Sequence, residues 1–366
     1  METLLAGIGA ERLATSRLTA GVLSVAGRTG PAVLFVHGNV SSSLFWQPTM
    51  LALPESYRPL AVDLRGFGDT DPEPVDATRG VRDYADDLAA VIDALGLPMV
   101  HLVGWSMGGG VALQYLADRP EAHRVASLTL VAPVSPFGFG GTRDAQGTLC
   151  DPSGAGCGGG AANPDFVARL AAGDRTDESP LSPRQVLLAH YVKPPYVPEH
   201  LDIFVESMLS TRVGDDHYPG TARTVDSWPG LAPGDRGVLN TMAPTHFRIA
   251  GLSEVAPKPP VLWLRGSDDV IVSDHSLYDL AYLGSIGASR AGRVSRPGHR
   301  SRCWRRPAPC STGTPPLAGA TVRWLSTTRA TARTWTRLSA LSLNCATTSP
   351  LPTPPRDDFA VRGPAH

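Results

Sequence analysis

Ser106 is the residue of this chain whose surroundings most clearly favour covalent chemistry. It sits in the run Gly-Trp-Ser-Met-Gly, after the apolar residues 100–103 and before the helix-like residues 110–116. A serine on a tight turn between a strand and a helix needs small neighbours, because the backbone and adjacent strands come close there. Such a turn raises the hydroxyl clear of the sheet and directs the next N–H at a substrate oxygen. The pattern predicts a nucleophilic serine.

Short apolar strands and amphipathic helices alternate around this motif. The helix predicted at residues 81–95 places its apolar side chains on one face and ends at Gly96. This alternation predicts an α/β fold with a doubly wound, mainly parallel sheet. The strands are expected at residues 22–26, 32–36, 59–64, 100–103, 125–131 and 260–265, with a further helix at 41–53.

The alternation stops after residue 134, where Gly and Pro become frequent. An irregular helical insertion between two core strands predicts a lid over the carboxyl edge of the sheet, where ligands bind in such folds. The expected helical pieces are 164–172, 182–192 and 199–210. The predicted parts are a first core part at 1–134, the lid at 135–256, a second core part at 257–287 and a tail at 288–366.

The composition describes a soluble globular protein, with 366 residues, 42% hydrophobic residues and a net charge of −1. No apolar run reaches the roughly 18 residues that span a bilayer, and the N-terminus lacks a basic leader, so a cytoplasmic location without membrane contact is expected. The body of the chain shows no metal-spaced His/Cys set, phosphate loop or basic stripe, which predicts no metal, cofactor or nucleic-acid partner. Cys150 and Cys157 flank a Gly-rich loop and could pair, although unpaired thiols are the expected state.

The order of the motifs resembles the α/β-hydrolase fold family over about residues 15–285. The motifs are His-Gly-Asn at 37–39, Asp-Leu-Arg-Gly-Phe-Gly-Asp at 63–69, the Gly-x-Ser-x-Gly run and Gly-Ser-Asp-Asp at 266–269. The first of them, with Phe45-Trp46 after it, is also similar to haloalkane dehalogenases. Those enzymes carry an aspartate nucleophile where this chain has Ser106, so the serine points to ester-type acyl transfer.

The resemblance implies an oxyanion hole beside Ser106, built from two backbone donors. One is the N–H of Met107, and the other is the N–H of Asn39. His37 and Gly38 are expected to shape the loop that carries Asn39, and His37 is not expected to act as the base.

The resemblance also implies an acid after the strand at 260–265, where Asp269 is preferred to Asp268. This carboxylate would hold the tautomer of the catalytic histidine and stabilise its imidazolium. In the order Ser, Asp, His, the candidate base is His299, in a Pro-Gly-His run. His190, His217 and His246 are interpreted as ordinary residues of the lid region.

The surroundings of His299 do not fit that role well, because no strand-like run precedes it and an arginine-rich stretch follows it. From residue 285 onward there are 13 Arg, no Lys and two acids, a net charge of +11. Read with each codon starting one base earlier, residues 325–338 can encode L-D-D-P-G-H-G-P-H-L, which has the expected Gly-His. We therefore hypothesise a frameshift near Ala288. The alternative is a native basic tail that binds nucleic acid or anionic membrane, and either reading predicts a poorly ordered tail.

These observations predict a monomeric or dimeric serine hydrolase that cleaves a small apolar ester, thioester or lactone through a Ser106 acyl-enzyme. Two alternatives within the same fold are a cofactor-free haloperoxidase and a C–C bond hydrolase. A third is an impaired hydrolase-like binding protein that lacks its triad histidine.

Overall fold

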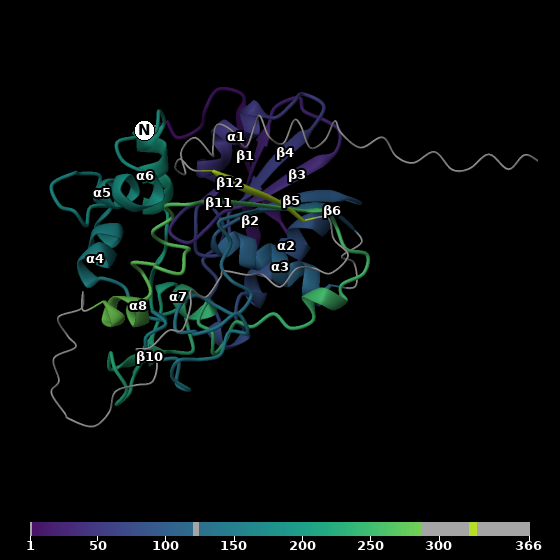
Figure 1. Ribbon diagram of the computed structural model, residues 1–366. Coiled ribbons are helices and arrows are strands. Elements are labelled where there is room, and N and C mark those ends of the chain that lie inside the picture. The colour runs from purple at the N-terminus through teal and green to yellow at the C-terminus, as the bar shows by residue number, and fades with distance from the viewer. Residues whose placement is uncertain (1, 120–123, 287–321, 328–366) are drawn as a thin grey trace, which may run out of the picture.

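One mainly parallel sheet forms the centre of the molecule (Figure 1). The computed structural model describes residues 2–119, 124–286 and 322–327. Within them the sheet has the order β1-β2-β4-β3-β5-β6-β11-β12. β2 pairs antiparallel with β1 and β4, and the strands from β4 to β12 pair in parallel. Their bounds are β1 Ile8–Ala14, β2 Thr19–Val25, β3 Ala32–Val36, β4 Arg58–Val62, β5 Val100–Trp105, β6 Val125–Val131, β11 Val261–Gly266 and β12 Val322–Thr327.

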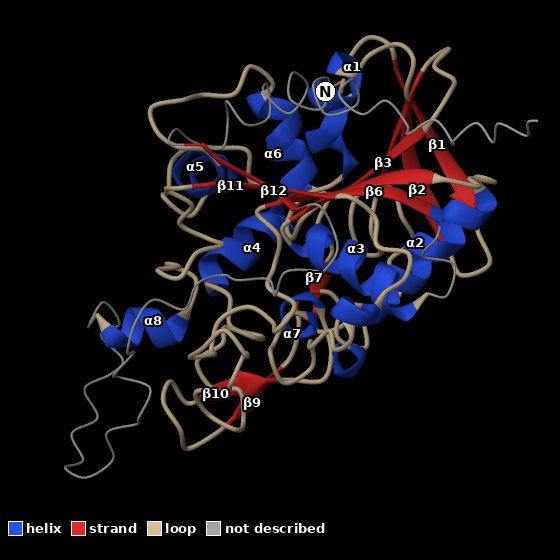
Figure 2. Cartoon of the chain, turned by 45° about the vertical axis from the view of Figure 1, so that its right-hand side comes forward, coloured by secondary structure: helices blue, strands red, loops and turns tan. Residues whose placement is uncertain are grey.

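Helices cover both faces of the sheet, as the alternating pattern predicts (Figure 2). On one face Trp46 and Met50 pack on inward-facing strand residues such as Phe35. On the other face Tyr84 and Val111 pack on the alternate strand residues. Successive strand side chains point to opposite faces, so each parallel strand supplies both cores. The covering helices are α1 Gln47–Ala52 on the first face, and α2 Arg82–Ala94 and α3 Met107–Asp118 on the second.

A long segment between β6 and β11, residues 132–260, interrupts the alternation of strands and helices; it is the inserted segment of this fold. It gathers at one side of the sheet in both views (Figures 1 and 2). Its helices are α4 Pro164–Ala172, α5 Pro183–Val186, η4 Leu187–Tyr191, α6 Leu201–Leu209, α7 Val238–Thr241 and η5 Leu252–Glu254. Its short strands are β7 Val213–Gly214, β8 Tyr218–Pro219, β9 Ala222–Thr224 and β10 Leu231–Pro233.

The predicted α/β sheet is confirmed. The structure adds a strand at each edge of the sheet and departs from the predicted bounds of several helical segments. The edge strands β1 and β12 and the helix α8, Leu280–Ser285, were not anticipated. The helix expected at 41–53 begins as a 3-10 turn, η1 Ser43–Trp46, before α1, and a second such turn, η2 Ala77–Arg79, precedes α2. The tail expected at 288–366 lies outside the described residues apart from β12.

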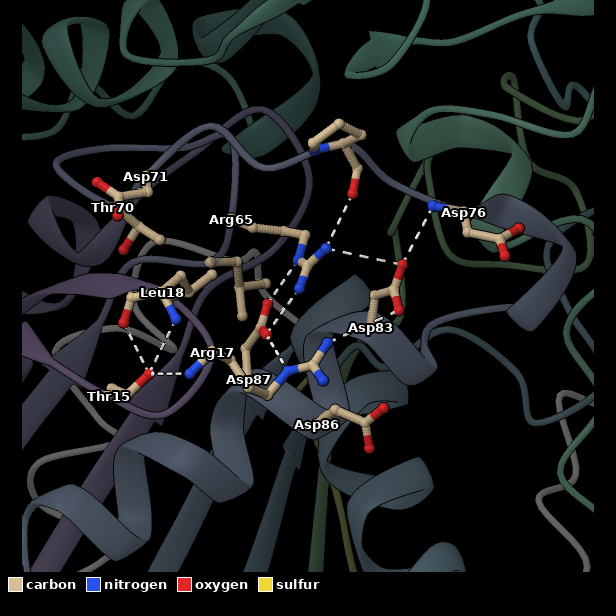
Figure 3. Close-up of polar contacts among 12 residues, drawn as sticks. Thr15, Arg17, Leu18, Arg65, Thr70, Asp71, Asp76, Asp83, Asp86 and Asp87 are labelled. Carbon is tan, nitrogen blue, oxygen red and sulfur yellow. Dashed lines mark hydrogen bonds and ion pairs between the residues drawn. The ribbon is translucent and has the colours of Figure 1, made fainter.

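A buried ion-pair cluster holds the loop after β4 against α2 (Figure 3). The Arg65 guanidinium donates two hydrogen bonds to Asp87, at 2.6 and 2.7 Å, and Arg17 donates a third at 2.7 Å. Asp83 lies 3.7 Å from the same guanidinium. The side chains of Arg65 and Asp87 are only 8% and 6% exposed. A buried charge of this kind is stable only while its partner remains.

Replacing Asp87 by Asn is expected to destabilise the fold by about 3 kcal/mol or more. The asparagine has nearly the same shape as the aspartate but no charge, so the buried Arg65 guanidinium loses its nearest counter-charge. The matched control is Asp118→Asn, which breaks the half-exposed pair with Arg82 and should cost no more than about 1 kcal/mol. Urea unfolding of the two variants measures both effects. Equal losses would show that the Arg65 cluster does not stabilise the fold in this way.

Candidate active site

Ser106 occupies a strained turn between β5 and α3. Its φ of 53° and ψ of −118° lie in a region that residues with a Cβ rarely adopt. The Ser106 N–H donates to the Val131 carbonyl at 3.0 Å, and the Ser106 carbonyl accepts from the Val134 N–H at 3.0 Å. These bonds hold the backbone on both sides of Ser106, so that the strained φ and ψ angles are kept. Backbone strain that is held in this way is typical of functional positions.

The turn closes only because the neighbouring positions have no side chain. A Cβ on Gly104 would lie 2.5 Å from the Gly108 carbonyl oxygen. A Cβ on Gly108 would lie 2.4 Å from the carbonyl oxygens of both Val36 and His37. These distances are far below van der Waals contact, so the spacing Gly-x-Ser-x-Gly is a steric requirement of this packing.

Two backbone segments lie beside the Ser106 turn. Met107 opens α3, so its N–H belongs to the first turn, where helical N–H groups have no intrahelical acceptor and favour negative charge. Gly38 packs directly against the turn, since a Cβ on it would lie 3.0 Å from Ser106 Cβ. Asn39 follows Gly38 and lines the same cavity as Ser106. Of the two residues predicted for the oxyanion hole, Met107 thus directly follows Ser106 in the chain and Asn39 lines the same cavity.

His37 lies under this loop with both ring nitrogens engaged. Its Nδ1–H donates to the Gly38 carbonyl at 2.7 Å, and its Nε2 accepts from the Leu64 N–H at 3.0 Å. Burial of the ring lowers the pKa of His37 to about 4, so the imidazole is neutral near pH 7. His37 therefore organises the backbone and has no nitrogen available to take a proton from Ser106.

The two neighbouring aspartates after β11 have different surroundings. Asp269 lines the cavity with Ser106, and its Oδ1 accepts from the N–H groups of Ile271 and Val272 at 2.8 and 2.9 Å. Burial raises the pKa of Asp269. Asp268 instead forms a surface ion pair with Lys193 of the inserted segment. Of the two, only Asp269 is placed to orient a group inside the cavity.

The cavity has a volume of about 520 Å³ and lies between the carboxyl edge of the sheet and the inserted segment. This volume suits a single small-molecule ligand. Ser106, Asn39 and Asp269 supply polar groups from the core. Large apolar and aromatic side chains make up much of the remaining wall, and the aromatic ones are Trp105, Phe139, Phe166, Tyr191, Tyr218 and Tyr278.

Among the histidines that the structure describes, His190 is the one that lines this cavity. Its ring meets Tyr278 edge-on at 5.5 Å, its Nδ1 is buried without a hydrogen-bond partner in the described residues, and burial lowers its pKa. The sequence interpretation of His190 as an ordinary residue missed this placement, because no motif surrounds it. His246 is engaged elsewhere, 2.9 Å from the Gly234 carbonyl. His299 lies outside the described residues.

The remaining expectations about this region concern cysteines, metals and membranes. Cys157 is a buried free thiol that lines the cavity, so it does not pair with Cys150, and burial raises its pKa to about 11. Within residues 2–119, 124–286 and 322–327, no three His, Cys, Asp or Glu side chains gather as metal ligands. The helices of those ranges include none with the length and apolarity needed to cross a membrane.

Comparison with known proteins agrees with this architecture. Residues 31–147 match the family described as alpha/beta hydrolase fold. RutD of Variovorax paradoxus (strain S110), whose name refers to carbamate hydrolysis, is 45% identical over 103 residues, which are 28% of this chain and 38% of RutD. Epoxide hydrolase 2 of Siraitia grosvenorii is 40% identical over 101 residues, 27% of this chain and 31% of that protein. Carboxylesterase YbfK of Bacillus subtilis (strain 168) is 32% identical over 111 residues, 30% and 36% of the two chains.

The family match includes the serine turn and ends at residue 147, so most of the inserted segment lies outside it. The chain spans only about a third of the length of these relatives, with coverage of 38%, 31% and 36%. Together, the family match and the sheet support the α/β-hydrolase fold. The bond that is cleaved differs among the relatives.

Replacing Gly108 by Ala tests the steric argument at the serine turn. The added methyl group meets two backbone carbonyls at 2.4 Å, so we expect a loss of about 1–3 kcal/mol in unfolding free energy. Gly9→Ala is the control, because the nearest atom to its Cβ is 3.8 Å away. Denaturant titration of both variants measures the difference. A Gly108 variant as stable as the Gly9 variant would contradict the proposed crowding.

The buried His37 predicts a defined pH dependence of stability. Its pKa is about 4 in the folded protein and 6.5 when exposed, so the unfolded chain binds more protons in that interval and His37 favours folding less as the pH falls from 6.5 to 4. Relative to His37→Gln, the wild type should lose about 3 kcal/mol across this range. Urea midpoints at several pH values give this difference. The raised pKa of Asp63, about 6, acts in the opposite direction but is present in both proteins. A constant difference between them would contradict the assignment.

Proposed function

We propose that this chain, which has the α/β-hydrolase fold, is a serine hydrolase that cleaves a carboxylic ester through an acyl-enzyme on Ser106. The observation that carries the proposal is the strained Ser106 turn, which opens into a cavity of about 520 Å³. The likeness to carboxylesterase YbfK favours an ester among the possible bonds. Thioesters and lactones present the same acyl carbon to the serine.

In the proposed reaction Ser106 Oγ attacks the ester carbonyl carbon while its proton passes to a base. The tetrahedral oxyanion is held by the N–H groups of Met107 and Asn39, preorganised donors that are worth several kcal/mol of barrier. The C–O bond then breaks, the base returns its proton to the departing alcohol, and the acyl group remains on Ser106. Water repeats the sequence and releases the acid.

Two histidines are candidates for the base. The chain order Ser, Asp, His favours His299, and the cavity favours His190, which shares its wall with Ser106 and Asp269. Burial lowers the pKa of His190, so that its ring is neutral and able to accept a proton near pH 7. Asp269 is the carboxylate that would orient the base and stabilise its imidazolium.

The substrate is proposed to be a moderately bulky, apolar ester. Aromatic side chains from both the core and the inserted segment form the walls of the cavity. In this proposal the inserted segment acts as a lid that excludes water from the acyl-enzyme. Hydrolysis by this route needs no metal or cofactor.

The proposal is tested by intact mass measurement of the full chain with and without a fluorophosphonate probe. The expected result is one adduct on the wild type, none on Ser106→Ala, and one on Ser153→Ala, a serine of a surface turn. The same panel should hydrolyse a short activated ester only where the adduct forms. A folded wild type without an adduct would contradict the proposed function and favour an impaired binding protein.

The same assay assigns the base. If His190 serves, His190→Ala should slow adduct formation by about two to four orders of magnitude while His299→Ala leaves it unchanged. The reverse result assigns His299. The mass of the untreated protein also distinguishes a tail with the arginine-rich sequence of residues 288–366 from the product of the shifted reading frame.

A further inference from the structure

The loop that carries Asn39 is held in an unfavourable backbone conformation. Val40 has a φ of 47°, although it is β-branched and this region is costly for such residues. A strained conformation persists only when surrounding contacts over-determine it. The side chains that hold this loop therefore decide where the Asn39 N–H points.

The peptide group that includes the Asn39 N–H is fixed from the core side. Its carbonyl belongs to Gly38, and it accepts from His37 Nδ1–H at 2.7 Å and from the Ser41 hydroxyl at 2.8 Å. His37 and Ser41 do not reach the next two carbonyl groups of the loop, which belong to Asn39 and Val40. These two carbonyls need a hydrogen-bond donor from elsewhere.

The hydroxyl group of Tyr191 provides that donor from the inserted segment. It lies 3.2 Å from the Asn39 carbonyl oxygen and 3.3 Å from the Val40 carbonyl oxygen. A phenol has one hydrogen to donate, and here it is shared between two carbonyls of the strained loop. Burial raises the pKa of Tyr191 well above its ordinary value, so the hydroxyl stays protonated.

The ring of Tyr191 also contacts the serine turn. It meets Trp105, the residue before Ser106, edge-on at 5.7 Å, and it lies 6.1 Å from Phe45. Phe45 itself lies 5.4 Å from Trp105 and stacks on Phe204 of α6 at 4.6 Å. One aromatic cluster thus joins the Asn39 loop, the end of β5 before Ser106, and the inserted segment.

We propose that Tyr191 is a positioning residue of the oxyanion hole, which couples transition-state stabilisation to the packing of the inserted segment on the core. This inference rests on the proposed function. Because Tyr191 ends η4, the Asn39 loop has its full set of hydrogen bonds only while the inserted segment covers the cavity. In this proposal the loop that carries the Asn39 N–H is held from both the core and the inserted segment when the substrate is enclosed.

Tyr191→Phe removes only the hydroxyl and keeps the ring. We expect kcat for a short activated ester to fall about 10- to 100-fold, because a displaced donor costs up to that factor, with KM changed less than about twofold. Affinity for a boronic acid, which forms a tetrahedral adduct on serine, should fall by the same factor as kcat. Affinity for the carboxylic acid product should not change.

Tyr196→Phe is the matched control. Tyr196 belongs to the same inserted segment as Tyr191, is 40% exposed, and is not one of the residues that line the cavity. Its variant should keep the wild-type kcat and boronic acid affinity. Equal effects of the two variants on kcat, or an effect of Tyr191→Phe on KM alone, would overturn the proposal.

Amide hydrogen exchange separates this inference from the proposed function, because it needs no turnover. In Tyr191→Phe, peptides that contain residues 39–43 should exchange faster than in the wild type and in Tyr196→Phe. Unchanged exchange there would overturn the positioning role even if Ser106 reacts with the fluorophosphonate. Faster exchange in a chain that never reacts would show that Tyr191 orders residues 39–43, but it would reject the hydrolase and with it the role of Tyr191 in an oxyanion hole.

Discussion

The close approach of backbone around Ser106 is the constraint on which the rest of the site depends. A Cβ on Gly104 or Gly108 would overlap nearby backbone atoms, and a Cβ on Gly38 would lie only 3.0 Å from Ser106 Cβ. This crowding brings the first turn of α3 and the end of β3 to the same point. The backbone of these two elements therefore lies directly against the serine turn.

The polar groups beneath the site are organised by burial rather than by exposed charge. His37 remains neutral because its ring is fully enclosed, and its two nitrogens fix Gly38 and Leu64. Asp63 accepts from the backbone N–H groups of Ser43 and Asp69, and ties the loops after β3 and β4 together. Buried polar groups whose hydrogen bonds are all made favour a single arrangement of the loops that they join. Any other arrangement would leave a buried polar atom with neither a protein partner nor water.

The inserted segment lines the cavity and also contacts the Asn39 loop. Tyr191 binds two carbonyls there, and Lys193, two residues later in the chain, pairs with Asp268. Ser42 and Ser207 share a buried hydrogen bond of 2.6 Å across the same boundary. Enclosure of the ligand and order of the Asn39 loop are thus linked by contacts between parts distant in sequence.

The sequence by itself determined the parallel sheet, the helices that cover it and the turn at Ser106, because strand and helix periodicity and the absence of a Cβ at fixed spacing are local properties of the chain. The resemblance of its motifs to a known family preferred Asp269 to Asp268 as the acid, but their different surroundings, the cavity for Asp269 and Lys193 for Asp268, appear only in the fold. What the tertiary structure alone decided is how the inserted segment meets the core. His190 and Tyr191 have no motif around them, and their positions follow from contacts with residues more than 80 positions away, such as Tyr278 and Asn39. No local pattern encodes such contacts, since they arise only when the whole segment packs over the sheet.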